Sequence, residues 1–446
     1  MDAFHCEYAW LGDPAADRAV RAVRVEITNG RISAVLTGVA PSPDAHRLDG
    51  LILPGLVNTH SHVFHRAIRG LTESGAADFW RWRDLMYGVA GRLDPDSMFR
   101  LARATYAEMA LAGITTVGEF HYLHHDVDGR PYGEPNAMAQ AVIAAADEVG
   151  LRLTLIDTCY LQADVDGGPL EGVQRRFGDG DWHGWAERAT LLRAGPGLRL
   201  GAAIHSVRAV AQEALAPVAT FARVQNRPLH VHLSEQPAEN EACLRVHGVT
   251  PTRLLADADV LGEATTAVHA THLTRADISL LGDAATAVSM CVTTERNLAD
   301  GIGRAPALAR AGAPVVLGTD GHMTIDMFEE ARGLELDERL RTGRRGHFRP
   351  GQLAAMLTSA GAASIGWDEA GRIEPGAVAD LTAVRLDTVR TAGARAVDPL
   401  APVLYAAAAA DVDTVIVGGQ VVVSDGRHRS IDAAGELEAA IAAVVR

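Results

Sequence analysis

The chain contains no lysine, so all 41 of its basic residues are arginine. This absence excludes a Schiff-base lysine and a carboxylated lysine that bridges two metal ions. Cysteine is also scarce, and no Cys-x-x-Cys pair occurs among Cys6, Cys159, Cys243 and Cys291. Four widely spaced cysteines argue against a disulfide framework and favour a reduced, cytoplasmic protein.

Long hydrophobic runs and an excess of positive charge are missing as well. No apolar run reaches the length that a membrane-spanning helix needs, and the first residues lack the basic start and apolar stretch of a secretory signal. The net charge is −15. Nucleic acid and anionic membranes are therefore poor partners for the surface as a whole, although a local group of arginines can still hold an anionic small molecule.

The central part of the sequence alternates apolar segments with amphipathic helical patterns. Eight β/α units of this size predict an α/β fold, a closed (β/α)8 TIM barrel, with the active site at the C-terminal ends of its strands. The alternative is an open doubly wound sheet, which is disfavoured because no Gly-x-Gly-x-x-Gly motif opens a helix after a strand. The predicted strands are residues 51–58, 115–121, 152–158, 198–205, 228–233, 266–272, 286–292 and 314–320.

Both ends of the chain carry strand–turn–strand patterns, including an Asn-Gly hairpin turn at Asn29. We expect residues 1–53 and 371–446 to form one small β-sandwich domain and residues 54–370 to form the barrel. Two separate β appendages would bury less apolar surface. The long segments 71–95 and 122–135 are interpreted as loops that cover the substrate.

Three predicted strands end in histidine or aspartate. His60 and His62 end the first strand, and residues two apart on a strand point the same way, so both imidazoles can meet one ion. His232 ends the fifth strand and Asp320 the eighth. Asp320 can complete a site of three histidines and one aspartate, assist proton removal from a water, or cap the next helix.

Two further positions suit acid/base chemistry. Glu235 follows His232 by three residues, where a carboxylate that is not a ligand can move protons between the activated water and the substrate nitrogen. The alternative for Glu235 is an acid at the start of a helix. His269 and His272 lie near the end of the sixth strand, and we expect only one to face the ion. His230 is interpreted as a packed core residue.

The joint placement of these residues at four strand ends is hard to attribute to chance. The segments PGLVNTHSH, HVHLSE, VHATHL and LGTDGH, in that order, with IEPGAVADLTAV near the end, resemble the amidohydrolase superfamily over nearly the whole chain. The lack of lysine agrees with its one-metal deaminase branch. The resemblance implies one zinc ion per chain on His60, His62, His232 and Asp320, with Glu235, His269 and Asp320 as the catalytic residues.

Within that branch, the segments HSHVFHRAIRGL, DFWRWRDLMY, GEFHYLHHD, HSVRAV and TTERNLADGIG resemble the formimidoylglutamate deiminase family. That resemblance implies zinc-dependent hydrolysis of N-formimidoyl-L-glutamate to N-formyl-L-glutamate and ammonia, in histidine degradation. Paired arginines suit bidentate carboxylate binding, whereas the alternative for each is a surface ion pair. The implied substrate-binding residues are His65, Arg83, Tyr122, His205 and Arg208.

Three positions depart from the family pattern. His65 stands where glutamine is usual, and Thr319 and Gly321 stand where serines surround the last aspartate. These departures leave the metal chemistry intact and keep other formimidoyl or amidine substrates open. Two alternatives remain, namely deamination of a purine- or pyrimidine-like ring and a non-catalytic barrel used in assembly. The expected partner is a small molecule with carboxylates, and we expect a homodimer.

Overall fold

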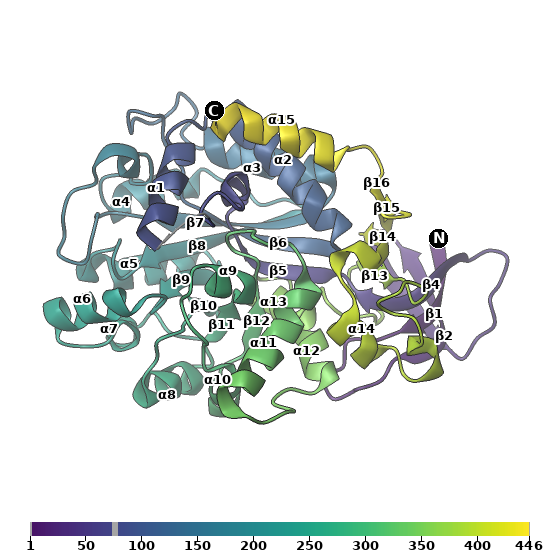
Figure 1. Ribbon diagram of the computed structural model, residues 1–446. Helices are drawn as coiled ribbons and strands as arrows, with labels where there is room; N and C mark the ends of the chain where they lie inside the picture. The colour runs from purple at the N-terminus through teal and green to yellow at the C-terminus, as the bar shows by residue number, and fades with distance from the viewer. Residues whose placement is uncertain (1, 74–78, 446) are drawn as a thin grey trace.

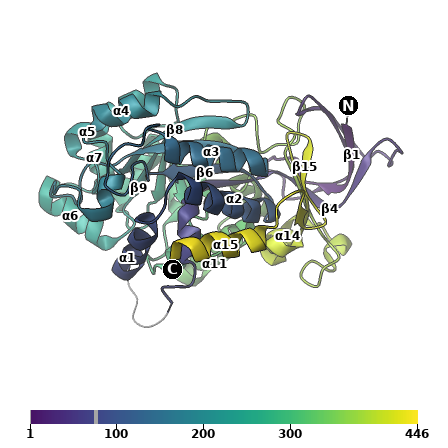
Figure 2. The same cartoon turned by 90° about the horizontal axis from the view of Figure 1, so that it is seen from above.

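The protein is built from two eight-stranded sheets, as the computed structural model shows for residues 2–73 and 79–445 (Figure 1). One sheet forms the barrel and is surrounded by helices. The other sheet, made from both ends of the chain, lies at one side of the barrel (Figure 2). Among the helices of these residues, none combines the length and apolar character needed to span a bilayer.

The barrel sheet is entirely parallel, and its strands follow one another in chain order. It closes where the backbone N–H groups of Thr319 and Asp320 donate to His60 O and where Ser61 pairs with Asp320. The predicted TIM barrel is thus confirmed. Its strands are β5 (Leu56–Ser61), β6 (Ile114–His121), β7 (Arg152–Cys159), β8 (Leu198–Ser206), β9 (Leu229–Leu233), β10 (Thr265–His269), β11 (Ala287–Met290) and β12 (Val315–Leu317).

Local sequence signals fix the ends of the surrounding helices. Asp94 caps α2 by accepting the Ser97 N–H, and Pro95 occupies the first turn. Gly150 ends α3 in the left-handed conformation that closes many helices. The helices around the barrel are α1 (Phe79–Ala90), α2 (Pro95–Leu111), α3 (Ala137–Val149), α4 (Trp182–Thr190), α5 (Gln212–Val224), α6 (Pro237–His247), α7 (Pro251–Asp257), α8 (Arg275–Asp283), α9 (Val292–Asn297), α10 (Ala305–Ala311), α11 (Met327–Thr342), α12 (Pro350–Met356) and α13 (Ser359–Ser364).

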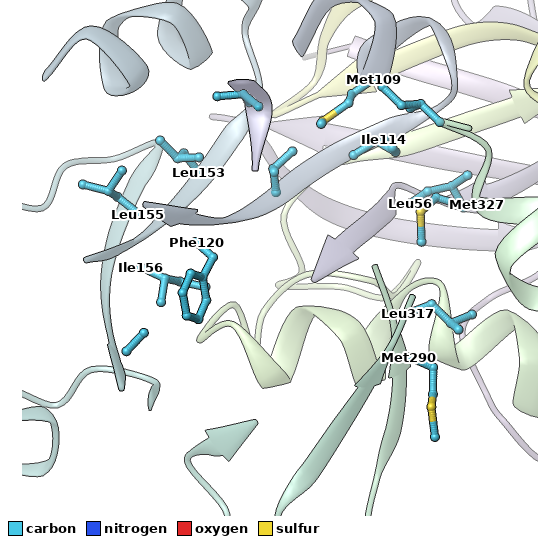
Figure 3. Close-up of a cluster of buried hydrophobic side chains, with 14 of the residues drawn as sticks. Leu56, Met109, Ile114, Phe120, Leu153, Leu155, Ile156, Met290, Leu317 and Met327 are labelled. Carbon is cyan, nitrogen blue, oxygen red and sulfur yellow. The ribbon is translucent and has the colours of Figure 1, made fainter. Parts of the chain in front are cut away.

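The main hydrophobic core joins the barrel strands to these helices. Figure 3 shows part of it, where Leu56, Ile114 and Leu317 from three strands lie near Met109 of α2 and Met327 of α11. Strands of a parallel sheet are covered on both faces, which explains their nearly continuous apolar sequences. Burial of each such side chain stabilises the fold by about 1.5–3 kcal/mol. The core therefore holds the strand ends in fixed positions.

The second sheet combines both ends of the chain. Its order is β16-β15-β14-β13-β4-β1-β2-β3, and the antiparallel pairing of β13 with β4 joins the C-terminal strands to the N-terminal ones. The ends therefore form one β-domain and not two appendages. The strands are β1 (Asp2–Ala9), β2 (Val20–Thr28), β3 (Arg31–Thr37), β4 (His46–Pro54), β13 (Leu381–Val384), β14 (Val412–Val417), β15 (Gln420–Ser424) and β16 (Arg427–His428).

Two predicted segments need correction. The predicted strand 51–58 is the end of β4 and the start of β5, because the chain passes from one sheet to the other at Gly55. A side chain at Gly55 would collide with Thr115 and Asp380, so glycine permits this close passage. The predicted loop 71–95 contains α1, whereas residues 74–78 lie outside the described residues. The segment 122–135 is a loop, as expected.

The C-terminal helix α15 (Ala433–Val445) lies on the barrel, although its residues follow the second sheet in the chain. It packs beside α2 (Figures 1 and 2), and Arg103 of α2 pairs with Glu436. The boundaries 1–53 plus 371–446 and 54–370 stay a prediction. The remaining helix of the C-terminal part is α14 (Leu400–Ala406).

Candidate active site

The predicted metal ligands meet at the C-terminal ends of the barrel strands. His60 Nε2 and His62 Nε2 each lie 3.4 Å from Asp320 Oδ1. His232, at the end of β9, places its Nε2 3.1 Å from His60 Nε2. All four side chains are buried. The alternation of β5 turns His60 and His62 inward, while Ser61 between them donates to Glu119.

The hydrogen bonds of these histidines prepare them to bind a cation. His62 Nδ1 donates to Phe120 O at 2.8 Å, and His232 Nδ1 donates to His205 O at 2.9 Å, so the Nε2 lone pairs of both rings face the site. Burial lowers the pKa of His60 to about 3 and lowers the pKa of His62 and His232, which keeps the rings neutral. The Nε2 atoms of His60 and His232 lie 3.1 Å apart, close enough to bind the same cation.

The donor set also fits a particular kind of ion. Ligand atoms of His60, His62 and His232 lie within 4.8 Å of one another, as do those of His60, His269 and Asp320. Three imidazoles and one carboxylate are ligands that Zn²⁺ takes in tetrahedral sites. Burial opposes ionisation of Asp320, but the hydrogen bond from His60 and the electrostatic effect of the surrounding imidazoles hold the pKa of Asp320 well below its usual range. The residues present therefore fit a divalent cation.

Glu235 and His269 lie beside this cluster. His269 Nε2 is 3.9 Å from Glu235 Oε1 and 3.8 Å from Asp320 Oδ2. Burial raises the pKa of Glu235. Burial lowers the pKa of His269, but the carboxylates of Glu235, Glu295 and Asp320 outweigh it and raise that pKa to about 10. A proton held between His269 and these carboxylates is thus available at the site.

The structure also bears on the alternatives for these residues. Glu235 directly precedes Gln236, the N-cap position of α6, so it stands at the start of a helix and also lines the pocket. Asp320 does not cap the next helix, because Asp326 caps α11. His272 does not line the pocket. His230 is buried, with Nε2 3.3 Å from Ser364 O, which confirms its interpretation as a core residue.

All five predicted substrate-binding residues line one pocket beside the cluster. His65 Nε2 lies 2.9 Å from the Tyr122 hydroxyl, and His205 stands at the end of β8. Arg208 is half-buried, lines the pocket and takes part in no ion pair within the described residues, which disfavours its surface ion-pair alternative. The pocket is lined by His62, His65, Trp82, Arg83, Met86, Tyr87, Tyr122, Tyr160, Phe177, His205, Arg208, His232, Glu235, His269 and Asp320.

Sequence reasoning missed two tyrosines of this pocket. Tyr87, on α1, accepts a hydrogen bond from Gln174 Nε2 at 3.3 Å, and the Arg83 guanidinium lies 5.6 Å from the centre of its ring. Burial raises the pKa of Tyr160, which therefore stays a neutral donor near Arg208. Tyr87 belongs to the quoted segment DFWRWRDLMY, but no fixed spacing ties it to the metal ligands. Only the fold brings α1 and the end of β7 to the same pocket.

The fold and the site together define a class, a hydrolase barrel whose strand ends are arranged to hold a metal ion beside a glutamate and a histidine. The chain belongs to the amidohydrolase family, whose model matches residues 51–422. It is 35% identical to the formimidoylglutamate deiminase of Pseudomonas aeruginosa over 96% of each chain. It is 31% identical to the 8-oxoguanine deaminase of the same species, over 92% of this chain and 91% of that one.

A solved structure agrees with this assignment. The crystal structure of an amidohydrolase from Brucella melitensis is 32% identical to this chain, covers 100% of both chains and superposes with a TM-score of 0.92. The chain is therefore an amidohydrolase of the deaminase type, which acts on carbon–nitrogen bonds. Because its relatives differ in substrate, the pocket itself has to indicate which substrate it takes.

Proposed function

We propose that the chain is a zinc-dependent deiminase that hydrolyses N-formimidoyl-L-glutamate to N-formyl-L-glutamate and ammonia in histidine degradation. The observation that carries the proposal is the presence of two arginines in the pocket that contains the acid/base pair. Arg83 comes from α1 and Arg208 from the turn after β8, and both line this pocket. Two guanidinium groups suit a substrate with two carboxylates. The printed name of the Pseudomonas relative supports the same substrate.

The pocket would orient such a substrate along one direction. Arg208, with the Tyr87 and Tyr160 hydroxyls near it, would bind one carboxylate, and Arg83 would bind the other. His65, Tyr122 and His205 lie between these groups and the metal cluster and would contact the middle of the molecule. The formimidoyl group would then lie against Glu235 and His269. Polar groups at fixed positions in a largely aromatic pocket confer this orientation.

The residues around the reacting carbon have separate tasks. When bound by His60, His62, His232 and Asp320, a single Zn²⁺ would supply Lewis-acid activation of a water. Asp320 and His269 would assist removal of the first proton from that water, whose oxygen bonds to the formimidoyl carbon. Glu235 would receive that proton and pass it to the formimidoyl nitrogen, and the second proton of the water would follow to the same nitrogen. The carbon–nitrogen bond then breaks, ammonia leaves with both protons, and the formyl product keeps the oxygen.

We propose that the enzyme works in the cytoplasm as a homodimer. The support is the sequence: four cysteines, all of them buried and unpaired, fit a reduced compartment, and the net charge of −15 disfavours nucleic acid and membranes as partners.

A second candidate is deamination of a purine-like ring. Aromatic side chains make up much of the pocket lining, and a planar base can stack on such side chains. The 8-oxoguanine deaminase relative fits this candidate. Arg208 favours the first proposal, because it lines the pocket without an ion pair among the described residues and a neutral ring offers no partner for its charge.

The test is ammonia release from the zinc-loaded protein with N-formimidoyl-L-glutamate, N-formimidoyl-L-aspartate, guanine, 8-oxoguanine and cytosine. We expect the highest kcat/KM with N-formimidoyl-L-glutamate and a lower value with the shorter aspartate analogue. A higher kcat/KM with any of the ring compounds would contradict the proposed substrate and support the second candidate.

A further inference from the structure

Behind the acid/base pair lies a carboxylate that does not line the pocket. Glu295, on α9, places Oε1 3.3 Å from His269 Nδ1, on the side of the ring opposite Glu235. Its side chain is only 6% exposed. The same oxygen accepts the backbone N–H of Cys291 at 2.8 Å, which fixes the carboxylate to the start of its own helix. Glu295 is thus oriented before any substrate enters.

A second carboxyl group follows in the same short segment. The Asp300 N–H donates to Glu295 O at 2.9 Å, and Asp300 Oδ1 accepts a hydrogen bond from the side-chain amide of Gln236. Gln236 directly follows Glu235 in the chain. Asp300 is buried, and burial together with the charge of Glu235 raises its pKa to about 9. Asp300 thus binds the side chain of Gln236, the residue that directly follows Glu235.

We propose that Glu295 and Asp300 act as a brace that positions His269 and Glu235 relative to each other. Here the brace means residues 295–300, and both carboxyl groups are positioning residues, because neither lines the pocket. The inference rests on the proposed roles of His269 and Glu235 in proton transfer. Residues 295–300 thereby position two side chains from different parts of the barrel, namely His269 at the end of β10 and Glu235 after the end of β9.

The geometry of His269 explains why a brace is needed. The Glu295 carboxylate accepts the N–H of His269 Nδ1, which leaves Nε2 facing Glu235 and Asp320. The backbone there is strained, since His269 and Ala270 have φ of 66° and 51°. Without Glu295, the imidazole ring of His269 would be free to flip. Nδ1 instead of Nε2 would then face the reacting atoms.

The first test compares Glu295→Leu and Glu295→Gln with Glu330→Gln as the matched control. Glu330 of α11 is also a buried glutamate, and it holds the same helix α9 by accepting the N–H and hydroxyl of Thr293, but it does not contact His269. We expect Glu295→Leu to lower kcat about 10- to 100-fold, the range for loss of a residue that orients a site side chain. KM and zinc content should stay unchanged.

Two more variants test whether the loss of activity comes from the brace. Glu295→Gln keeps an oxygen that can accept the His269 N–H, so it should recover much of the activity lost in Glu295→Leu. Asp300→Ala should lower kcat with little change in KM. An equal loss in Glu330→Gln, or a fall in zinc content that accounts for the loss in Glu295→Leu, would overturn the brace and leave only a structural role for this segment.

A spectroscopic measurement separates this inference from the proposed function. A hydrogen-bonded His269 Nδ1–H should give a downfield proton resonance, identified by its loss in His269→Asn. We expect this resonance to disappear in Glu295→Leu and to persist in Glu330→Gln, with or without zinc. Its survival in Glu295→Leu would refute the brace whatever substrate the enzyme takes. Failure of all tested substrates, with the resonance behaving as expected, would instead refute the proposed function.

Discussion

Replacement of Arg188 by methionine should destabilise the barrel strongly. Arg188, on α4, is buried and binds two acids: its Nη1 and Nη2 lie 2.8 Å and 3.0 Å from the oxygens of Asp157, and its Nε lies 2.9 Å from Asp179. Its Nη1 also donates to Asn136 at 3.1 Å. Within the described residues, methionine would remove the one arginine that binds these two carboxylates, which would leave Asp157 without an ion-pair partner and Asp179 with His125 alone.

The magnitude follows from this environment. Loss of one partner of a buried ion pair costs about 3–5 kcal/mol, because the remaining charge stays in a site of low polarity. Unfolding entropy is about 2 cal/mol/K per residue, or about 0.9 kcal/mol/K for 446 residues. We therefore expect Arg188→Met to lower Tm by about 3–5 °C at neutral pH.

The assay is differential scanning calorimetry of the zinc-loaded protein at one fixed scan rate. Arg253→Met is the control, since Arg253 forms an exposed pair with Asp257 and its loss should change the free energy of unfolding by less than about 1 kcal/mol. Equal Tm values for Arg188→Met and Arg253→Met would refute the reasoning.

The ion pairs of Arg188 with Asp157 and Asp179 also make the stability of the protein depend on pH. Burial opposes ionisation of Asp157 and Asp179, but Arg188 outweighs it for Asp157, and His125 with Arg188 outweighs it for Asp179, so the pKa of each lies below its usual range. The stability that a depressed carboxyl pKa contributes is present above the unfolded pKa, near 4, and is lost as pH falls through the folded pKa. The Tm difference between wild type and Arg188→Met should therefore shrink below about pH 4. A difference that grows on acidification would contradict this sign.

Three further predictions concern the site. Glu235→Gln should keep the metal, measured by atomic emission, and lower kcat about 10²- to 10⁴-fold, the range for loss of a general acid/base group; retained turnover would contradict its role. Arg208→Met should lower kcat/KM for N-formimidoyl-L-glutamate about 10- to 100-fold, since hydrogen bonds to charged groups contribute about 1.5–3 kcal/mol, while any ring deamination should be spared. Removal of metal by a chelator should abolish ammonia release, and added Zn²⁺ should restore it; full activity of the metal-free protein would contradict the site.

Most of the barrel could be predicted from its sequence, because each strand is a short apolar run and each ends before a polar group. His60, His62, His232 and Asp320 could be placed for the same reason, since strand ends of one closed parallel sheet share one face. The helix α1 could not be separated from the surrounding loop, because its apolar residues are interspersed with charged ones. The division at Gly55 was also missed, as β4 and β5 are both apolar and only one residue separates them.

The residues that support the site were beyond sequence reasoning for another reason. Glu295 and Asp300 act through contacts with His269 and Gln236, which lie far from them in the chain, and no spacing rule connects such pairs. Tyr87 and Tyr160 reach the pocket from α1 and from the end of β7, so their meeting depends on how a helix packs on the barrel. Patterns along one strand or helix are read from the sequence, whereas contacts between elements need the fold.

The most direct test of the central claim is an anomalous diffraction map of zinc-loaded crystals, collected on both sides of the zinc absorption edge. We expect one peak per chain, bonded to His60, His62, His232 and Asp320 at about 2.0–2.2 Å, with Glu235 outside bonding distance. A second peak in the site, a peak that lacks two or more of these ligands, or no peak at all would contradict the account.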